Sequence, residues 1–524
     1  MNSIQPVLLA GAWRASAGEA TFLATNPRTM EPIPEPYPIS PWPEVEEAVR
    51  AADQAFREMQ NLGPLAAAEF LEKFASRIDA RRAELVAQAE RETALPAEPR
   101  LNSNELPRTT DQLRQAAAAA RERSWSLPTI DKERNIRSMY RALGPVAVFG
   151  PNNFPLAFNS AAGGDFAAAI AAGCPVIAKA NTSHPGTTRL LAEEAFTVIK
   201  ELGLPPAMVQ LIYRTSHADG EKLVSHPLLG ATAYTGSRSA GLTLKHAADR
   251  AGKPIYLELS SINPVVILPG ALKERASRIA EEFQASCLLG TGQFCTNPGL
   301  VLLIDGAPTQ AFIKEVAERF ASAPVGTLLG AGVQKSLIEG IARMRSAGAE
   351  AVVGAESGGG QGFSHRNTLL LTSGTKFLQH AEAMQTEAFG NASLFVVCRD
   401  AVELGRVIDA LEGNLTGCFY TDTNGSDDKL YSELEPALRC KVGRLLNDKM
   451  PTGVAVSPAM NHGGPYPATG HPGFTAVGIP ASLRRFAMLA CYDNVREERL
   501  PPELRDKNPT GRVWRYINGG WTRD

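Results

Sequence analysis

The sequence lacks the features that mark membrane-spanning or disulfide-rich secreted proteins. No apolar run reaches the length of about 18 residues that a transmembrane helix needs. No Lys or Arg precedes Arg14, and the apolar run at 6–12 is too short for a secretory signal. The seven cysteines include no CxxC pair, so neither a disulfide framework nor a zinc site is expected. We therefore expect a protein of the reducing cytoplasm.

An excess of charge of one sign is also missing. The chain carries 53 Lys and Arg against 55 Asp and Glu, a formal net charge of −2, without a basic block. This balance argues against nucleic acid or an anionic membrane as the main partner, but it permits a local cationic pocket. With 524 residues, the chain is too long for one ordinary core, and two or three domains are expected.

Strand-like and helical segments alternate along most of the chain. Closely spaced prolines exclude a helix before about Glu44, and helical periodicity follows as far as about Arg100. Two series of short apolar strands separated by helical segments come next, with a boundary near Ser260. The predicted strands are 146–149, 175–179, 209–213, 231–234 and 255–259, then 263–268, 300–304, 368–371, 394–398 and 418–420. This order predicts an α/β protein with parallel, doubly wound sheets.

Cys295 lies in a loop rich in glycine and threonine, LGTGQFCTNP at 289–298. A cysteine nucleophile needs a thiolate, donors for an oxyanion and a base from elsewhere in the fold. A lone cysteine fits equally well as a small buried hydrophobe. Cys287, inside the preceding predicted helix, provides an internal comparison.

Three polar residues follow predicted strands, where ligands gather in an open α/β sheet. Glu258 ends an apolar strand and is a candidate general base, or a carboxylate satisfied by backbone donors. Asn153, in the turn GPNNFP at 150–155, can donate its amide to an oxyanion or close an Asx-turn. Lys179 can meet a phosphate or ribose, or only water.

A glycine turn at 236–241, GSRSAG, opens a predicted helix. Backbone N–H groups at such a helix start can bind phosphate. The pattern is not GxGxxG, and glycine turns before helices are common, so this segment alone has little specificity.

Together and in this order, these segments resemble the aldehyde dehydrogenase superfamily over roughly residues 20–500. The matching motifs are GPNNFP at 150–155, Lys179, YTGS at 234–237, LEL at 257–259, GQFC at 292–295 and EAFG at 387–390. The resemblance implies an aldehyde dehydrogenase-like α/β fold with a Rossmann-type cofactor domain, a second α/β catalytic domain and a small β oligomerisation arm. The corresponding residues are 1–123 and 143–260, then 261–460, then 124–142 and 480–524. It also implies a homodimer or homotetramer.

The resemblance further implies roles for single residues. Cys295 would be the nucleophile, Glu258 the base that activates water, and Asn153 with the Cys295 N–H the oxyanion hole. The cofactor site would comprise Lys179 and Glu387 on the riboses, Ser237 at the pyrophosphate and Phe389 near the nicotinamide ribose, together with Gly236 and Leu259. No metal is implied.

One departure from the family pattern concerns the cofactor. The family often has a Glu three residues after the lysine, bonded to the adenosine ribose, whereas this chain has Thr182. A carboxylate there would repel a 2′-phosphate, whereas Thr can donate to it. Arg214 and His217 can add positive charge. We therefore predict use of NADP, with NAD as the alternative.

Three further segments narrow the resemblance: 163–165, 295–299 and the loop GGPYPATG at 463–470. They are similar to a bacterial branch with 2,5-dioxopentanoate (α-ketoglutaric semialdehyde) dehydrogenases and NADP-linked fatty aldehyde dehydrogenases. This predicts oxidation of 2,5-dioxopentanoate to 2-oxoglutarate through a cysteine thiohemiacetal and thioester, or else oxidation of a fatty or medium-chain aldehyde. Arg484 and Arg485 are candidates to bind the substrate carboxylate.

Two interpretations of another class remain. The same cysteine could serve a CoA-acylating dehydrogenase or a thioester hydrolase, but Glu258 favours water as the acyl acceptor. A non-catalytic structural protein on this fold is disfavoured, because Cys295, Glu258 and Asn153 are all present.

Overall fold

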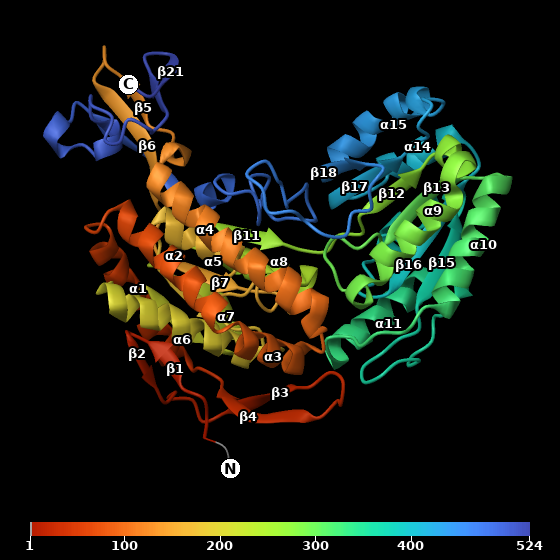
Figure 1. The fold of residues 1–524 in the computed structure, drawn as a ribbon, viewed down its shortest axis with the longest axis horizontal. Helices are drawn as coiled ribbons and strands as arrows, with labels where there is room; N and C mark the ends of the chain where they lie inside the picture. Colours follow the sequence, from red (N-terminus) through yellow and green to blue (C-terminus); the bar gives the residue numbers. More distant parts are fainter. Residues whose placement is uncertain (1–2) are drawn as a thin grey trace.

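Two seven-stranded sheets form two lobes in the computed structural model, which describes residues 3–524 (Figure 1). Met1 and Asn2, which open the predicted cofactor domain, lie outside the described residues. The first lobe contains the N-terminal half of the chain and the second contains the segments from β12 to β18, as the sequence colours show (Figure 1). The alternating pattern thus produced the expected α/β fold.

The first sheet has the order β11-β10-β7-β8-β9-β1-β2. The five strands from β11 to β9 are parallel, and β1 joins antiparallel to β9 through Leu8 and Leu211. Parallel strands are covered on both faces and are therefore continuous apolar runs, which is why the sequence located them well. The strands are β1 (Val7–Leu9), β2 (Ala12–Arg14), β7 (Val146–Phe149), β8 (Val176–Lys179), β9 (Val209–Ile212), β10 (Ala231–Thr235) and β11 (Ile255–Glu258).

Helices α1 to α8 accompany this sheet (Figure 1). α1 begins at Trp42, with a proline in its first turn where no N–H partner is needed. Before α5, residues 161–163 form turns, and only 164–172 are helical. The helices are α1 (Trp42–Met59), α2 (Pro64–Ala80), α3 (Arg82–Thr93), α4 (Leu106–Glu122), α5 (Gly164–Ala172), α6 (Pro185–Leu202), α7 (His217–Val224) and α8 (Arg238–Arg250), with the π-helical turn η1 (Ala97–Glu105) before α4.

The second sheet has the order β14-β15-β16-β13-β12-β17-β18, and only β14 is antiparallel to its neighbour. On one side, the rings of Phe283 and Phe395 pack with centroids 5.2 Å apart. The strands are β12 (Pro264–Ile267), β13 (Leu300–Ile304), β14 (Glu350–Val353), β15 (Thr368–Ser373), β16 (Ala392–Cys398), β17 (Asn414–Tyr420) and β18 (Val442–Asn447). The helices are α9 (Pro269–Leu288), α10 (Ala307–Ser322), α11 (Ala331–Ser346), α12 (Gly374–Gln379), α13 (Ala381–Met384), α14 (Ala401–Asp409) and α15 (Asp428–Lys441).

A five-stranded sheet projects from the first lobe and carries the C-terminus (Figure 1). It joins two distant parts of the chain, since β19 pairs with β6 along its whole length. Its strands are β5 (Thr129–Asp131), β6 (Ile136–Ala142), β19 (Ala487–Asp493), β20 (Arg515–Ile517) and β21 (Gly520–Thr522). β3 (Thr21–Thr25) and β4 (Pro32–Pro38) form a separate hairpin, and the short turns are η2 (Ser124–Ser126), η3 (Leu289–Gly292), η4 (Ala481–Phe486), η5 (Glu497–Arg499) and η6 (Pro502–Leu504).

The segment 448–480, which follows β18, contains no regular helix or strand and runs back from the second lobe to the first (Figure 1). It binds the end of β11 through two backbone hydrogen bonds, from Leu259 N to Ala468 O (2.8 Å) and from Gly470 N to Leu257 O (3.0 Å). We call it the crossing segment. Within residues 3–524, no helix is both long and apolar enough to span a membrane.

Candidate active site

Cys295 lies in the loop that joins the end of α9 to β13. Asn263, just before β12, holds this loop through its side-chain amide, which donates to the carbonyls of Cys295 and Asn297 at 2.9 Å each. The Asn263 Oδ1 atom in turn accepts from Thr416 at 2.9 Å. Because both ends of this amide are bound, the loop has one orientation, and the sulfur borders a cavity of about 440 Å³.

Asn153 borders the same cavity from the loop after β7. Its Nδ2 atom donates one hydrogen to the Gln293 carbonyl at 3.0 Å, which fixes the amide. Among the described residues, neither the second hydrogen of this amide nor the backbone N–H of Cys295 has an acceptor. These two free donors, next to the sulfur, have the composition of an oxyanion hole.

A buried ion pair supports the loop that carries Asn153. Arg100 pairs with Glu105, and its Nη2 atom donates to the Asn153 carbonyl at 2.9 Å. The Glu105 carboxylate also accepts the backbone N–H groups of Leu156 (2.8 Å) and Ala157 (3.0 Å). The loop is therefore held by charge-assisted bonds at Asn153 itself and at the residues that follow it.

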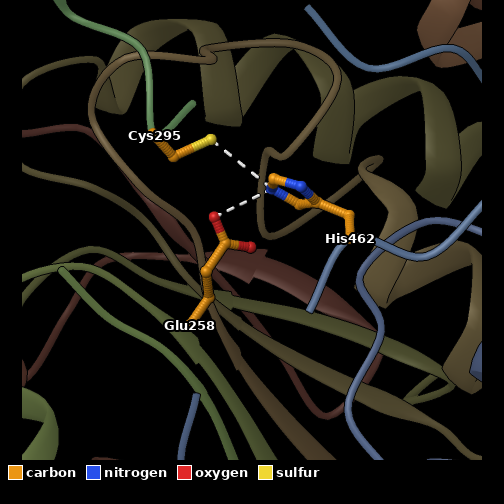
Figure 2. A group of neighbouring side chains, drawn as sticks. All are labelled: Glu258, Cys295 and His462. Atoms are coloured by element: carbon orange, nitrogen blue, oxygen red, sulfur yellow. Dashed lines mark hydrogen bonds and ion pairs between the residues drawn. The ribbon is translucent and has the colours of Figure 1, made fainter. Parts of the chain in front are cut away.

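Glu258 ends β11 and meets Cys295 through a third residue, His462 of the crossing segment. The His462 Nε2 atom lies 3.0 Å from Glu258 Oε1 and 3.4 Å from Cys295 Sγ (Figure 2). Glu258 Oε2 has no hydrogen-bond partner in the described part of the chain. One oxygen of the carboxylate is thus bound to the imidazole, while the other remains able to accept a proton.

The surroundings of Cys295 keep its thiol neutral in the unliganded protein. Burial, reinforced by the negative charge of Glu258, raises the pKa of Cys295 well above its usual value, whereas Arg108 acts in the opposite direction. Attack by sulfur therefore needs a nearby proton acceptor, and the Glu258–His462 pair is in position. Cys287 differs: burial raises its pKa to about 12, and its sulfur is enclosed in the core.

The residues assigned to a cofactor lie along two cavities that share Gly236 and Ser237. Glu258, Leu259, Glu387 and Phe389 line the cavity of Cys295, and a neighbouring cavity of about 760 Å³ is lined by Lys179, Thr182, Arg214 and His217. Ser237 is the residue before the first turn of α8, whose N–H groups suit a phosphate.

The charged groups of these cavities fit a dinucleotide. Lys179 has no hydrogen bond or ion pair within residues 3–524, and burial lowers its pKa to about 8, with a contribution from the Arg214 charge. At the other end, burial raises the pKa of Glu387 to about 7, and this carboxylate accepts a hydrogen bond from Ser261 N at 3.3 Å. An unpaired cation and an acceptor carboxylate provide what phosphates and ribose hydroxyls require.

Two arginines considered as carboxylate anchors are not available in this structure. Arg484 donates its Nε to the Trp125 carbonyl at 3.2 Å. Arg485 is buried, forms an ion pair with Asp165 at 2.7 Å and packs on the rings of Phe474 and Phe486. Neither lines the cavity of Cys295, because both are bound near the base of the five-stranded sheet.

Sequence reasoning missed His462, Asn263 and Arg108. His462 stands one position before the motif at 463–470, so it was next to a recognised signal, but nothing in its own spacing connected it to Cys295. Ligand atoms of Glu258, Cys295 and His462 lie within 4.8 Å of one another, a donor set that could also bind a metal ion. The expectation of no metal stays a prediction.

Comparison with known proteins agrees with this site. The model of the aldehyde dehydrogenase family matches residues 13–442, and the chain belongs to this family. It is therefore an enzyme that oxidises an aldehyde with a nicotinamide cofactor.

Comparison with single curated proteins gives a more specific similarity. The chain is 40% identical to alpha-ketoglutaric semialdehyde dehydrogenase 2 of Azospirillum brasilense, covering 96% of this chain and 97% of the relative. It is 35% identical to alpha-ketoglutaric semialdehyde dehydrogenase of Acinetobacter baylyi, with 98% of both chains covered. Among solved structures, lactaldehyde dehydrogenase from Escherichia coli matches with a TM-score of 0.79 at 21% identity, over 94% of this chain and 99% of the other, which shows the fold.

Asn153→Ala tests the oxyanion site. Loss of the free amide donor should slow formation of the acyl-enzyme by about 100-fold or more, since one such donor is worth on the order of 3 kcal/mol. Single-turnover measurement of reduced cofactor reports this step. Asn152→Ala, in the same loop, is the control and should keep most of the rate. A normal rate for Asn153→Ala would remove the assignment.

His462→Phe tests the imidazole between sulfur and carboxylate. Without Nε2, the thiol loses a proton acceptor and Glu258 loses its partner, so kcat should fall by about 100-fold. The pH profile of Cys295 alkylation by iodoacetamide should also change. His471→Phe, on the exposed part of the same segment, should leave both unchanged. An unaltered profile in His462→Phe would show that Glu258 and Cys295 act without the imidazole.

Proposed function

We propose that this enzyme oxidises 2,5-dioxopentanoate to 2-oxoglutarate and uses NADP as the electron acceptor. The observation that supports this most is the convergence of Cys295, Glu258 and Asn153 on one cavity, in a chain 40% identical to an alpha-ketoglutaric semialdehyde dehydrogenase. The cavity supports the reaction type, and the relative supports the substrate.

The first half-reaction begins with loss of the Cys295 proton to the Glu258–His462 pair. The thiolate attacks the aldehyde carbon, and the carbonyl oxygen becomes an oxyanion that accepts hydrogen bonds from the Asn153 amide and the Cys295 N–H. When bound, the oxidised nicotinamide supplies the two-electron acceptor that turns this thiohemiacetal into a thioester.

The second half-reaction is hydrolysis. The free oxygen of Glu258, Oε2, takes a proton from a water molecule, which attacks the thioester carbon. The carbon–sulfur bond breaks and the carboxylic acid leaves. Of the two protons taken up by the Glu258–His462 pair in the two half-reactions, one returns to Cys295 and the other passes to solvent. Asn153 binds the oxyanion again in this step. Because a carboxylate base borders the cavity, water is favoured over CoA as the acyl acceptor.

Preference for NADP rests on the cavity at Lys179. Thr182 occupies the position where a carboxylate would repel a 2′-phosphate, and Lys179, Arg214 and His217 line the same space. The cationic side chains of Lys179 and Arg214 would favour binding of a dianionic 2′-phosphate in this cavity. NAD remains the alternative cofactor.

A second candidate substrate is a medium-chain or fatty aldehyde. A cavity of about 620 Å³ next to the active site has charged residues on part of its wall and apolar side chains on another part, including Phe154, Phe294, Val454 and Val456. The apolar part of this wall suits a hydrocarbon chain.

Assembly and location complete the proposal. We propose a homodimer or homotetramer built through 124–142 and 480–524, in the cytoplasm. The five-stranded sheet supports the proposed assembly, because the apolar side chains of Met488 and Leu489 in β19 are 52% and 57% exposed there.

A panel of aldehydes with both cofactors tests the function. We expect the highest kcat/KM for 2,5-dioxopentanoate with NADP, free 2-oxoglutarate as product and no increase in rate on adding CoA. Cys295→Ala should abolish oxidation, whereas Cys287→Ala should retain it. A higher kcat/KM for decanal would support the second candidate instead. Oxidation by Cys295→Ala would refute the nucleophile.

Thr182→Glu tests the cofactor. The new carboxylate should repel the 2′-phosphate and lower kcat/KM for NADP by about 100-fold, while kcat/KM for NAD stays equal or rises. Thr182→Gln, of the same size without the charge, is the matched control. A wild-type kcat/KM at least about tenfold higher for NAD than for NADP would contradict the proposed preference.

A further inference from the structure

One cation next to the active site has no partner. Arg108, in the first turn of α4, lines the cavity of about 620 Å³ together with Phe154 and Phe294. Phe154 also lines the cavity of Cys295, so the two spaces share a wall. Arg108 makes no hydrogen bond or ion pair within residues 3–524, and its Nε and Nη2 atoms are buried.

Such an arrangement is unfavourable unless something else binds the guanidinium. Burial lowers the pKa of Arg108 although the charge of Glu105 acts in the opposite direction, and within residues 3–524 no carboxylate forms an ion pair with the guanidinium. Two aromatic faces lie against it: the guanidinium carbon is 4.9 Å from the ring centre of Phe158 and 5.5 Å from that of Phe154. These contacts fix its position but do not satisfy its donors.

The other arginines of this region are already bound. Arg100, on the same cavity, pairs with Glu105 and with the Asn153 carbonyl. Arg444 donates to the carbonyls of Pro451 (2.7 Å) and Gly453 (3.1 Å). Within the described chain, Arg108 is therefore the arginine of this group whose donors remain free for a ligand.

Arg108 is also close enough to the sulfur for the two charges to interact. Its positive charge lowers the pKa of Cys295, opposing burial and the charge of Glu258, and the charges of Glu105 and Glu258 act on Arg108 in turn. Because the cavities of Cys295 and Arg108 meet at Phe154, a short substrate whose aldehyde reaches Cys295 would direct its far end toward this guanidinium.

We propose that Arg108 binds the carboxylate at the far end of the substrate and so selects acid semialdehydes over uncharged aldehydes of the same length. The inference rests on the proposed oxidation at Cys295. A guanidinium can hold a carboxylate by two parallel hydrogen bonds, which fixes both distance and direction. An uncharged aldehyde leaves these buried donors unpaired. The free-energy cost of the unpaired donors selects against binding of such an aldehyde.

Arg108→Met tests the assignment on the full-length enzyme. For 2,5-dioxopentanoate, kcat/KM should fall by about 100-fold, mainly through KM, because a hydrogen-bonded charge pair is lost. For pentanal, which has no carboxylate, kcat/KM should stay equal or rise. Arg108→Lys should retain part of the preference. Arg114 lies on the same helix and its side chain is exposed. Arg114→Met is therefore the control, and kcat/KM should stay unchanged for both substrates.

A binding measurement separates this inference from the proposed reaction. Glutarate has no aldehyde, and it should protect Cys295 of the wild type, but not of Arg108→Met, from alkylation by iodoacetamide. An equal loss of activity toward both substrates would overturn the inference, since Arg108 would then act on the thiol or the fold. Unchanged selectivity, or protection by glutarate in Arg108→Met, would also overturn it. Protection in a wild type that oxidises none of the aldehydes would instead refute the proposed function and leave the anion site standing.

Discussion

The hydrogen bond between Glu258 and His462 joins the two halves of the active site. Glu258 belongs to the first sheet, and His462 comes from the crossing segment that follows the second sheet. Backbone hydrogen bonds from the same segment to Leu257 and Leu259 reinforce this junction. The position of the base relative to Cys295 therefore depends on how the lobes are connected, not on either lobe alone.

Each group around the substrate is held by a second set of buried polar contacts. Asn263 fixes the Cys295 loop, and the Arg100–Glu105 pair fixes the Asn153 loop. These contacts leave free the donors and acceptors that the reaction uses. Such an arrangement lowers reorganisation during catalysis, because the dipoles already point to where charge develops. In the proposed complex, a substrate carboxylate would supply the partner that the buried Arg108 guanidinium lacks among residues 3–524.

Much of the fold followed from the sequence for a physical reason. Central strands such as β7 and β13 are covered on both faces and are therefore apolar throughout, and the helices between them keep a regular apolar spacing. Cys295, Glu258 and Asn153 were found because loops and strand ends carry recognisable motifs, and the structure brings them to one cavity. Arg484 and Arg485 were wrong as anchor candidates, since nearness in sequence to a pocket loop said nothing about Asp165 or Trp125, which bind them.

The sequence by itself determined the alternation of strands and helices and indicated the candidate reactive groups. These depend on local patterns, which neighbouring residues carry. The tertiary structure alone decided that His462 lies between Cys295 and Glu258. It also decided that, within residues 3–524, the Arg108 guanidinium has no hydrogen-bond partner while that of Arg100 has two. Those facts depend on contacts between residues far apart in the chain, where packing, not spacing, sets which polar groups meet.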